Sequence, residues 1–274
     1  MSGDQAWHAE RNRQCEEVAV GPELWAVLIV GAAVAGWIDA VIGGGGLVLI
    51  PLLMAVVPGL APATALGTNK LTAVTGTASA AWTMMRRVRP RFSPWYVVLG
   101  LGCSGAGALS ASLIDATLLR PLIIVLLLAV GAFVALRPGF GTQVRGGTAE
   151  PGRWRRLLVL LLVGVIAFYD GIFGPGTGMF LIMAFTAVLS QDFLRSAAMA
   201  KVVNTSTNLG ALLVFAVGGH VWWQLGVVLA VANIVGAQLG ARTVLGGGVK
   251  LVRTALLVVV IVMSSYLAWQ QFSS

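Results

Sequence analysis

The chain is poor in charged residues and in the side chains on which most enzymes depend. Charged residues make up 10% of its 274 positions, against about 25% in soluble domains. It has two cysteines and two histidines. Cys15 and Cys103 form no spacing motif and give no support for a structural disulfide. No nucleophile–base pair, paired carboxylates, metal-ligand cluster or phosphate-binding loop of the G-x-x-x-x-G-K type is present, so we expect no catalytic residues, no metal and no cofactor.

What the chain has in abundance is apolar sequence. Hydrophobic residues make up 58% of the chain, the mean hydropathy is +0.89, and there are 35 glycines. Continuous apolar runs of about 20 residues predict an all-α polytopic protein embedded in a lipid bilayer. The net charge of +8 does not indicate a nucleic acid partner, because the arginines cluster in short loops beside apolar runs, as the positive-inside rule expects.

The apolar runs predict about ten membrane segments, five in each half of the chain. In the first half we expect them at residues 24–42, 46–57, 63–85, 95–112 and 117–136. In the second half we expect them at residues 156–173, 178–190, 193–217, 222–241 and 250–269. The second segment of each half is too short to cross a hydrocarbon core of about 30 Å. Each is therefore a half-helix or part of a re-entrant hairpin, which is tolerated only inside protein or beside a wet cavity.

The two halves repeat one pattern at an offset of 131 residues. Asp39 is followed by a glycine cluster and Lys70, and Asp170 is followed by a glycine cluster and Lys201, with the same spacing in both halves. We divide the chain into a polar tail (1–23), a first transmembrane repeat (24–137), a cytoplasmic linker (138–154) and a second transmembrane repeat (155–270). Duplication with glycine-broken segments is typical of transporters.

Loop charge predicts how the halves are inserted. Basic residues concentrate in residues 86–94, 137–156 and 242–253, and all three loops face the cytoplasm if the count of segments is correct. Both termini then lie outside. Because each half has an odd number of segments, the halves form an inverted repeat.

Lys70 and Lys201 are the candidate charges of the membrane interior. A lysine at this depth costs several kcal/mol unless it snorkels, pairs or faces water. Snorkelling to the nearer interface is the alternative to a function. The recurrence of the lysine at one repeat position favours function, and a cation beside a helix break suits an anionic substrate.

The glycine clusters also have two interpretations. They allow helices to cross closely, or they free backbone N–H groups that bind an anion at a helix start. Asp39 and Asp170, which end the first helix of each half, either cap the break and pair with a lysine or carry protons as coupling residues. On the helix of Lys201, Asn204 and Asn208 share its face. A threonine and serine stripe at Thr68, Thr72, Thr75 and Ser79 lines a pathway, binds a neighbouring helix or does both.

A possible homo-oligomer contact is the face of Gly236 and Gly240, which form a G-x-x-x-G pair, with Gly105 at the matching place in the first half. The alternative is packing within one subunit.

The paired motifs resemble those of the sulfite exporter TauE/SafE family of anion permeases. The segments DAVIGGGGLVLIP from Asp39 and ALGTNKLTAVTGTASA from Ala65 are similar to its first motif. The segments YDGIFGPGTGMFLI from Tyr169 and AMAKVVNTSTNLGAL from Ala198 are similar to its second, and GAQLGARTVL from Gly236 to its later glycine-rich helix. The second copy has Ala200 where the first has Asn69, so the half-sites are not chemically equal.

The resemblance implies a multi-pass protein of a bacterial-type inner membrane that transports sulfur-containing anions such as sulfite or sulfonates. The substrate-binding candidates carried over by position are Gly43, Gly44, Gly45, Gly46, Asn69 and Lys70 in the first half, and Gly174, Gly176, Gly178, Lys201, Asn204 and Asn208 in the second. A secondary carrier is the leading hypothesis. An anion channel and a membrane accessory or scaffold protein are the alternatives, and an intramembrane enzyme lacks the residues it would need.

Overall fold

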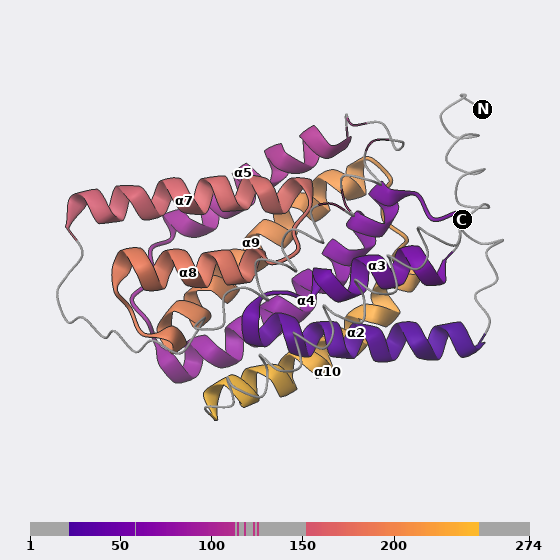
Figure 1. The fold of residues 1–274 in the computed structure, drawn as a ribbon, viewed down its shortest axis with the longest axis horizontal. Helices are drawn as coiled ribbons and strands as arrows, with labels where there is room; N and C mark the ends of the chain where they lie inside the picture. Colours follow the sequence, from indigo (N-terminus) through magenta and orange to yellow (C-terminus); the bar gives the residue numbers. More distant parts are fainter. Residues whose placement is uncertain are drawn as a thin grey trace.

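The computed structural model describes residues 22–57, 59–112, 114, 118, 123, 125 and 152–246, and over these ranges it contains helices and no strand (Figure 1). The first half contributes α2 (Pro22–Ile42), α3 (Gly46–Val56), α4 (Pro62–Val88) and α5 (Trp95–Ser112). The second half contributes α7 (Arg153–Ile172), α8 (Thr177–Leu189), α9 (Phe193–Val217) and α10 (Trp223–Leu245).

These helices match eight of the predicted segments to within a few residues. The largest difference is at the C-terminal end of α10, followed equally by the C-terminal end of α4 and the N-terminal end of α7, and both C-terminal extensions include an arginine, Arg242 and Arg86. A cation in the last turn favours a helix, because it complements the dipole. Most of segments 117–136 and 250–269, of the tail 1–23 and of the linker 138–154 lies outside the described residues.

Three helices, α2, α9 and α10, are long and apolar enough to cross a membrane. The second helix of each half is short, as predicted: α3 has 11 residues and α8 has 13. In Figure 1, α2 begins at the right-hand end of the molecule and α7 at the left-hand end, and both stop near the centre. The short helix α3 lies in the right-hand part of the molecule, where α2 begins, and the short helix α8 lies in the left-hand part, where α7 begins.

The halves are interlocked rather than placed side by side. α10 packs against α2 and α4, whereas α5 packs against α7 and α9. The fourth helix of each half therefore covers the other half. α4 and α9 cross each other between these two groups, which brings Lys70 and Lys201 close to the partner half.

Glycine makes the breaks after α2 and α7 possible. Gly43 and Gly174 occupy matching repeat positions and have φ angles of +79° and +100°, which only glycine adopts without strain. Gly43 also lies against Gly178, and a Cβ atom on either glycine would collide with the backbone of the other. The two broken segments thus meet backbone to backbone at the centre of the fold.

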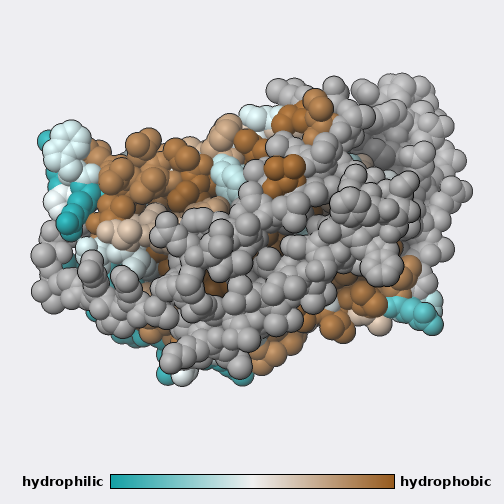
Figure 2. Space-filling model, in the orientation of Figure 1, coloured by the Kyte–Doolittle hydropathy of each residue, from teal (hydrophilic) through white to brown (hydrophobic). Residues whose placement is uncertain are grey.

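The surface around this core is apolar. Leu161 and Val165 on α7 are 64% and 60% exposed, and Figure 2 shows hydrophobic residues over this region with hydrophilic residues at the left-hand end. Exposed side chains of this kind along the length of a helix are suited to lipid.

The glycine face that suggested an oligomer contact is used inside the chain. A Cβ on Gly236 would collide with the backbone of Ala33, and one on Gly240 with that of Trp37, so both glycines let α10 approach α2. The nearest atom to a Cβ on Gly105 is the main-chain oxygen of Gly210 at 3.7 Å. The G-x-x-x-G pair therefore gives no ground for an oligomer, and the alternative of packing within one subunit is the one the structure supports.

Candidate functional site

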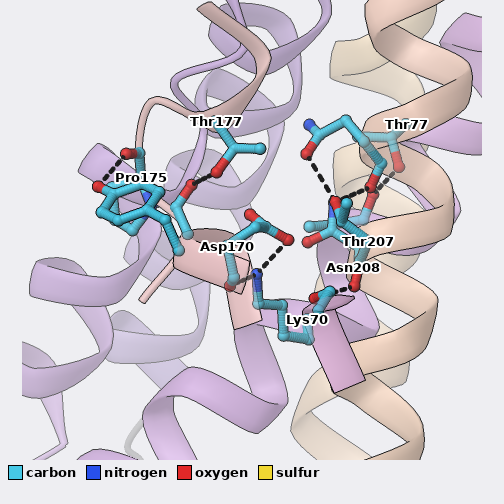
Figure 3. Close-up of polar contacts among 12 residues, drawn as sticks. Lys70, Thr77, Asp170, Pro175, Thr177, Thr207 and Asn208 are labelled. Carbon is cyan, nitrogen blue, oxygen red and sulfur yellow. Dashed lines mark hydrogen bonds and ion pairs between the residues drawn. The ribbon is translucent and has the colours of Figure 1, made fainter. Parts of the chain in front are cut away.

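Lys70 from the first half is paired with Asp170 from the second. Its Nζ atom lies 2.8 Å from Asp170 Oδ2 and also donates to the main-chain oxygen of Asp170, at 2.6 Å (Figure 3). The two side chains are 1% and 2% exposed. Because Asp170 lies in the last turn of α7, the ammonium neutralises both the carboxylate and the negative end of the helix dipole.

Lys201 from the second half is paired with Asp39 from the first. Its Nζ atom lies 3.4 Å from Asp39 Oδ2 and also donates to the main-chain oxygen of Asp39. Lys201 is fully buried, whereas the Asp39 side chain is 13% exposed. The other carboxylate oxygen, Oδ1, accepts from the N–H of Gly45 at 3.3 Å, so Asp39 pairs with a lysine and also caps the start of α3.

The two pairs are reciprocal: each lysine bonds the side chain and the main chain of the aspartate in the opposite half. Neither lysine snorkels. The other charged residues in the described helices lie in terminal turns, in the set Glu23, Arg86, Arg87, Arg153, Arg155, Arg156, Arg195 and Arg242. At the depth of the breaks, the described part of the chain therefore holds two positive and two negative charges.

The second-half break packs directly on one of these pairs. A Cβ at Gly174 would lie 2.6 Å from Lys70 Nζ and 3.0 Å from Asp170 Oδ1, so glycine is required there for space as well as for its φ angle. The Tyr169 hydroxyl donates to the main-chain oxygen of Pro175, and the Thr177 hydroxyl donates to that of Gly174 (Figure 3). Gly176, at the start of α8, has a φ of +82°.

At the first-half break, the four glycines at 43–46 make different contacts from the glycines at the second-half break. Gly43 meets Gly178, and the carbonyls of Gly44 and Gly45 accept the first N–H groups of α3. A Cβ on Gly45 would lie 2.7 Å from Asp39 Cβ, and one on Gly46 would lie 3.4 Å from Pro175. Gly43 and Gly46 therefore lie at the junction of the two halves, whereas Gly44 and Gly45 shape the start of α3.

The three candidate asparagines are buried, at 4% exposure or less. The Asn208 side-chain amide donates to the main-chain oxygen of Asn204, and the Thr207 hydroxyl lies 3.4 Å from Asn204 Oδ1 (Figure 3). Asn69 adjoins Lys70 in the sequence. The asparagines thus lie on the same two helices as the lysines, and each helix carries amide and ammonium groups within two turns.

The threonine stripe of the first half has a structural role. The Thr68 hydroxyl accepts from the N–H of Trp222, and Thr72 donates to the main-chain oxygen of Thr68 and, at 3.5 Å, to that of Gly226. Ser79 is hydrogen-bonded to Gln238. The contacts of Thr68, Thr72 and Ser79 join α4 to α10, so these members of the stripe bind a neighbouring helix.

Three features of this site were not found from the sequence. The cross-half pairing depends on the interlocking of the halves, which no local pattern encodes. Tyr169 and Thr177 donate hydrogen bonds to main-chain oxygens of the second-half break. In the sequence, only their place inside the repeated motif could have indicated this role. Tyr169 also packs against Phe173 and Phe180, so it fastens α7 to the broken segment.

Comparison with known proteins assigns the family. The family model for the sulfite exporter TauE/SafE matches residues 28–267. The chain belongs to the sulfite exporter TauE/SafE family. It is 38% identical over 256 residues to the probable membrane transporter protein YfcA of Escherichia coli (strain K12), with 91% of each chain covered.

Two further relatives agree with this assignment. A probable membrane transporter protein of Haemophilus influenzae is 35% identical, with 92% of this chain and 97% of the relative covered. The probable membrane transporter protein ORF9 of Sinorhizobium sp is 33% identical, with 88% and 91% covered. No solved structure matches the chain significantly.

Membership in the TauE/SafE family makes this a membrane transporter and not an enzyme, because the family and its relatives are named as transporters. The apolar helices agree with a multi-pass protein of the cell membrane. The buried ion pairs and the broken helices are therefore parts of a transport protein.

Proposed function

We propose that this TauE/SafE member is a secondary transporter that moves small sulfur-containing anions, such as sulfite or organosulfonates, by alternating access. The observation that carries the proposal is the reciprocal pair of buried lysines, Lys70 and Lys201, at the junction of two broken helices. A buried cation held beside the starts of two helices is suited to bind an anion, because the helix dipoles add positive potential there.

The substrate-binding residues in this proposal come from both halves. Lys70, Asn69 and the glycines at 43–46 form the first half-site. Lys201, Asn204, Asn208 and the glycines Gly174, Gly176 and Gly178 form the second. An oxyanion between them would receive ammonium, amide and main-chain N–H donors, which are the groups that bind anions most strongly.

Alternating access would follow from an inverted repeat, which we propose for this chain. The packing of α10 on α2 and α4 and of α5 on α7 and α9 supports it, since exchange of the halves turns one set of contacts into the other. In Figure 1 the end of α4, the start of α7 and the end of α10, all basic, lie at the left-hand end. This supports a cytoplasmic face there, with the start of α2 on the opposite side.

The test is uptake by the purified protein in proteoliposomes. The panel consists of sulfite, sulfate, thiosulfate, organosulfonates and carboxylates, with protein-free liposomes as the control. We expect saturable uptake of a sulfur-containing anion and a loss of about 10- to 150-fold in apparent affinity on Lys70→Met or Lys201→Met, the cost of a charge-assisted hydrogen bond. Uptake that does not saturate would indicate a channel, and no uptake of any anion in the panel would overturn the proposed anion substrates.

A further inference from the structure

We propose that the carboxylate of Asp39 occupies the binding position of the transported oxyanion, and that protonation of Asp39 vacates this position. The inference rests on the proposed transport function and deepens it: it states how an oxyanion is recognised and what its movement is coupled to. In this view Asp39 is an internal substitute for the substrate.

The contacts of Asp39 are those of an anion ligand. One carboxylate oxygen lies 3.4 Å from Lys201 Nζ, and the other accepts from the N–H of Gly45 at 3.3 Å, at the start of α3. An ammonium group and a helix start together form a binding site for a negatively charged oxygen pair. Sulfite, sulfonates and carboxylates all present adjacent anionic oxygens, so any of them can replace this group on the same two donors.

The contacts of the Asp39 carboxylate are also long enough for a substrate anion to replace it. Both distances exceed the usual 2.7–2.9 Å of a charge-assisted hydrogen bond, and the Asp39 side chain is 13% exposed. Asp170, in contrast, lies 2.8 Å from Lys70 and is 2% exposed. In this conformation Asp39 is the more loosely held and the more exposed of the two aspartates.

Among the described residues, few ionisable groups lie on the helices that pack against α2, and the one that pairs with Asp39 is Lys201. α2 packs against α3, α4, α8, α9 and α10. Of these, α3 and α8 carry no acidic or basic residue. The inner charges of α4 and α9 are Lys70, already paired with Asp170, and Lys201 itself. The arginines of α4, α9 and α10 lie in terminal turns.

Charge balance then fixes the order of events. An anion that entered while Asp39 was ionised would place a second negative charge beside a single buried lysine, which is costly. When a proton forms an O–H bond on Asp39, the ammonium of Lys201 keeps its three protons and its bond to the main-chain oxygen of Asp39 but loses its anionic partner, and the anion takes over that ion pair. Release reverses the step: the anion leaves, Asp39 loses its proton, and the pair with Lys201 forms again. One proton therefore moves in the same direction as each monovalent anion.

The experiment measures proton movement directly in wild-type proteoliposomes that contain a trapped pH-sensitive dye. Methanesulfonate and sulfite are the probes, and methanesulfonate stays ionised at every pH used. We expect methanesulfonate or sulfite added outside to acidify the lumen, and the apparent affinity for methanesulfonate to weaken as the pH is raised, by up to about tenfold for each pH unit when one proton is bound with each anion. This arm needs no variant and so does not depend on the folding of one.

The variant arm uses Asp39→Asn, with Glu23→Gln as a matched control on the same helix, where Glu23 is exposed in the first turn. Asp39→Asn should bind the anion more tightly than the wild type at high pH, with an affinity independent of pH and without proton movement, while Glu23→Gln keeps the wild-type profile. Anion uptake without proton movement, or a wild-type pH profile in Asp39→Asn, would overturn the inference and leave transport itself intact. No uptake of any anion by the wild type would instead overturn the proposed function, and this inference with it.

Discussion

The two ion pairs come from the same repeated motif but differ in geometry. Lys70 and Asp170 are in close contact and excluded from solvent, at 2.8 Å and with exposures of 1% and 2%. Lys201 and Asp39 are 3.4 Å apart, and Asp39 is partly exposed. A duplicated site need not be symmetric in one conformation, and a carrier that alternates between two conformations requires that its half-sites differ at any moment.

The largest expected effect comes from breaking the closer pair. Lys70→Met leaves Asp170 buried without its partner, which costs about 3–5 kcal/mol for a fully buried pair. Lys201→Met should cost less, because Asp39 reaches solvent and keeps its bond from Gly45. Thermal unfolding of the purified variants in detergent would measure the difference.

The control for this comparison is the double variant Lys70→Met with Asp170→Asn. It removes both charges and should recover part of the stability that Lys70→Met loses, because no buried charge is left unpaired. Equal destabilisation by Lys70→Met and Lys201→Met would show that the two pairs are energetically alike and would remove the difference described above.

The sequence predicted the helices and the breaks better than it predicted the contacts. Apolar runs and glycine clusters are local signals, and the described helices follow them to within a few residues. Burial of both lysines was expected from their depth. Which carboxylate each lysine meets was not, because Asp170 lies 100 residues from Lys70 and their contact depends on how the halves interlock.

The same limit explains why two alternatives could not be decided from the sequence. Thr68 and Thr72 were compatible with a pathway, with helix packing or with both, and the helix that they bind is known only from the position of α10. Gly236 suggested an oligomer contact because a sequence shows a small-residue face but not which helix covers it. Here α2 of the same chain covers it.

A second prediction concerns the point at which the halves cross. Gly43→Ala should destabilise the protein by a few kcal/mol and abolish transport, because its Cβ would collide with the backbone of Gly178 and overpacking costs about 1–3 kcal/mol in addition to the strain of a positive φ. Thermal unfolding and uptake measure both effects.

Gly59 offers a matched control for this substitution. It has the same φ of +79°, but nothing lies within 4 Å of an added Cβ. Gly59→Ala therefore carries the backbone strain alone and should keep most of the transport. If Gly43→Ala behaved like Gly59→Ala, close contact between the two breaks would not be required for function.

The smallest effect on stability is expected from cysteine substitutions that test how the protein is oriented in the membrane. Single cysteines placed at positions 90, 145 and 247, in a variant lacking Cys15 and Cys103, should leave stability unchanged, because all three positions fall in predicted loops. An impermeant thiol reagent applied to intact cells should label none of them, and all three should react after the membrane is opened, since the basic loops are expected on the cytoplasmic side.

A cysteine at position 219, in the loop between α9 and α10, should react in intact cells, because an inverted repeat places that loop on the opposite side. Labelling of position 90 or 247 from outside would mean that the two halves are not inserted in opposite directions, and the exchange between two unequal half-sites would then lose its structural basis.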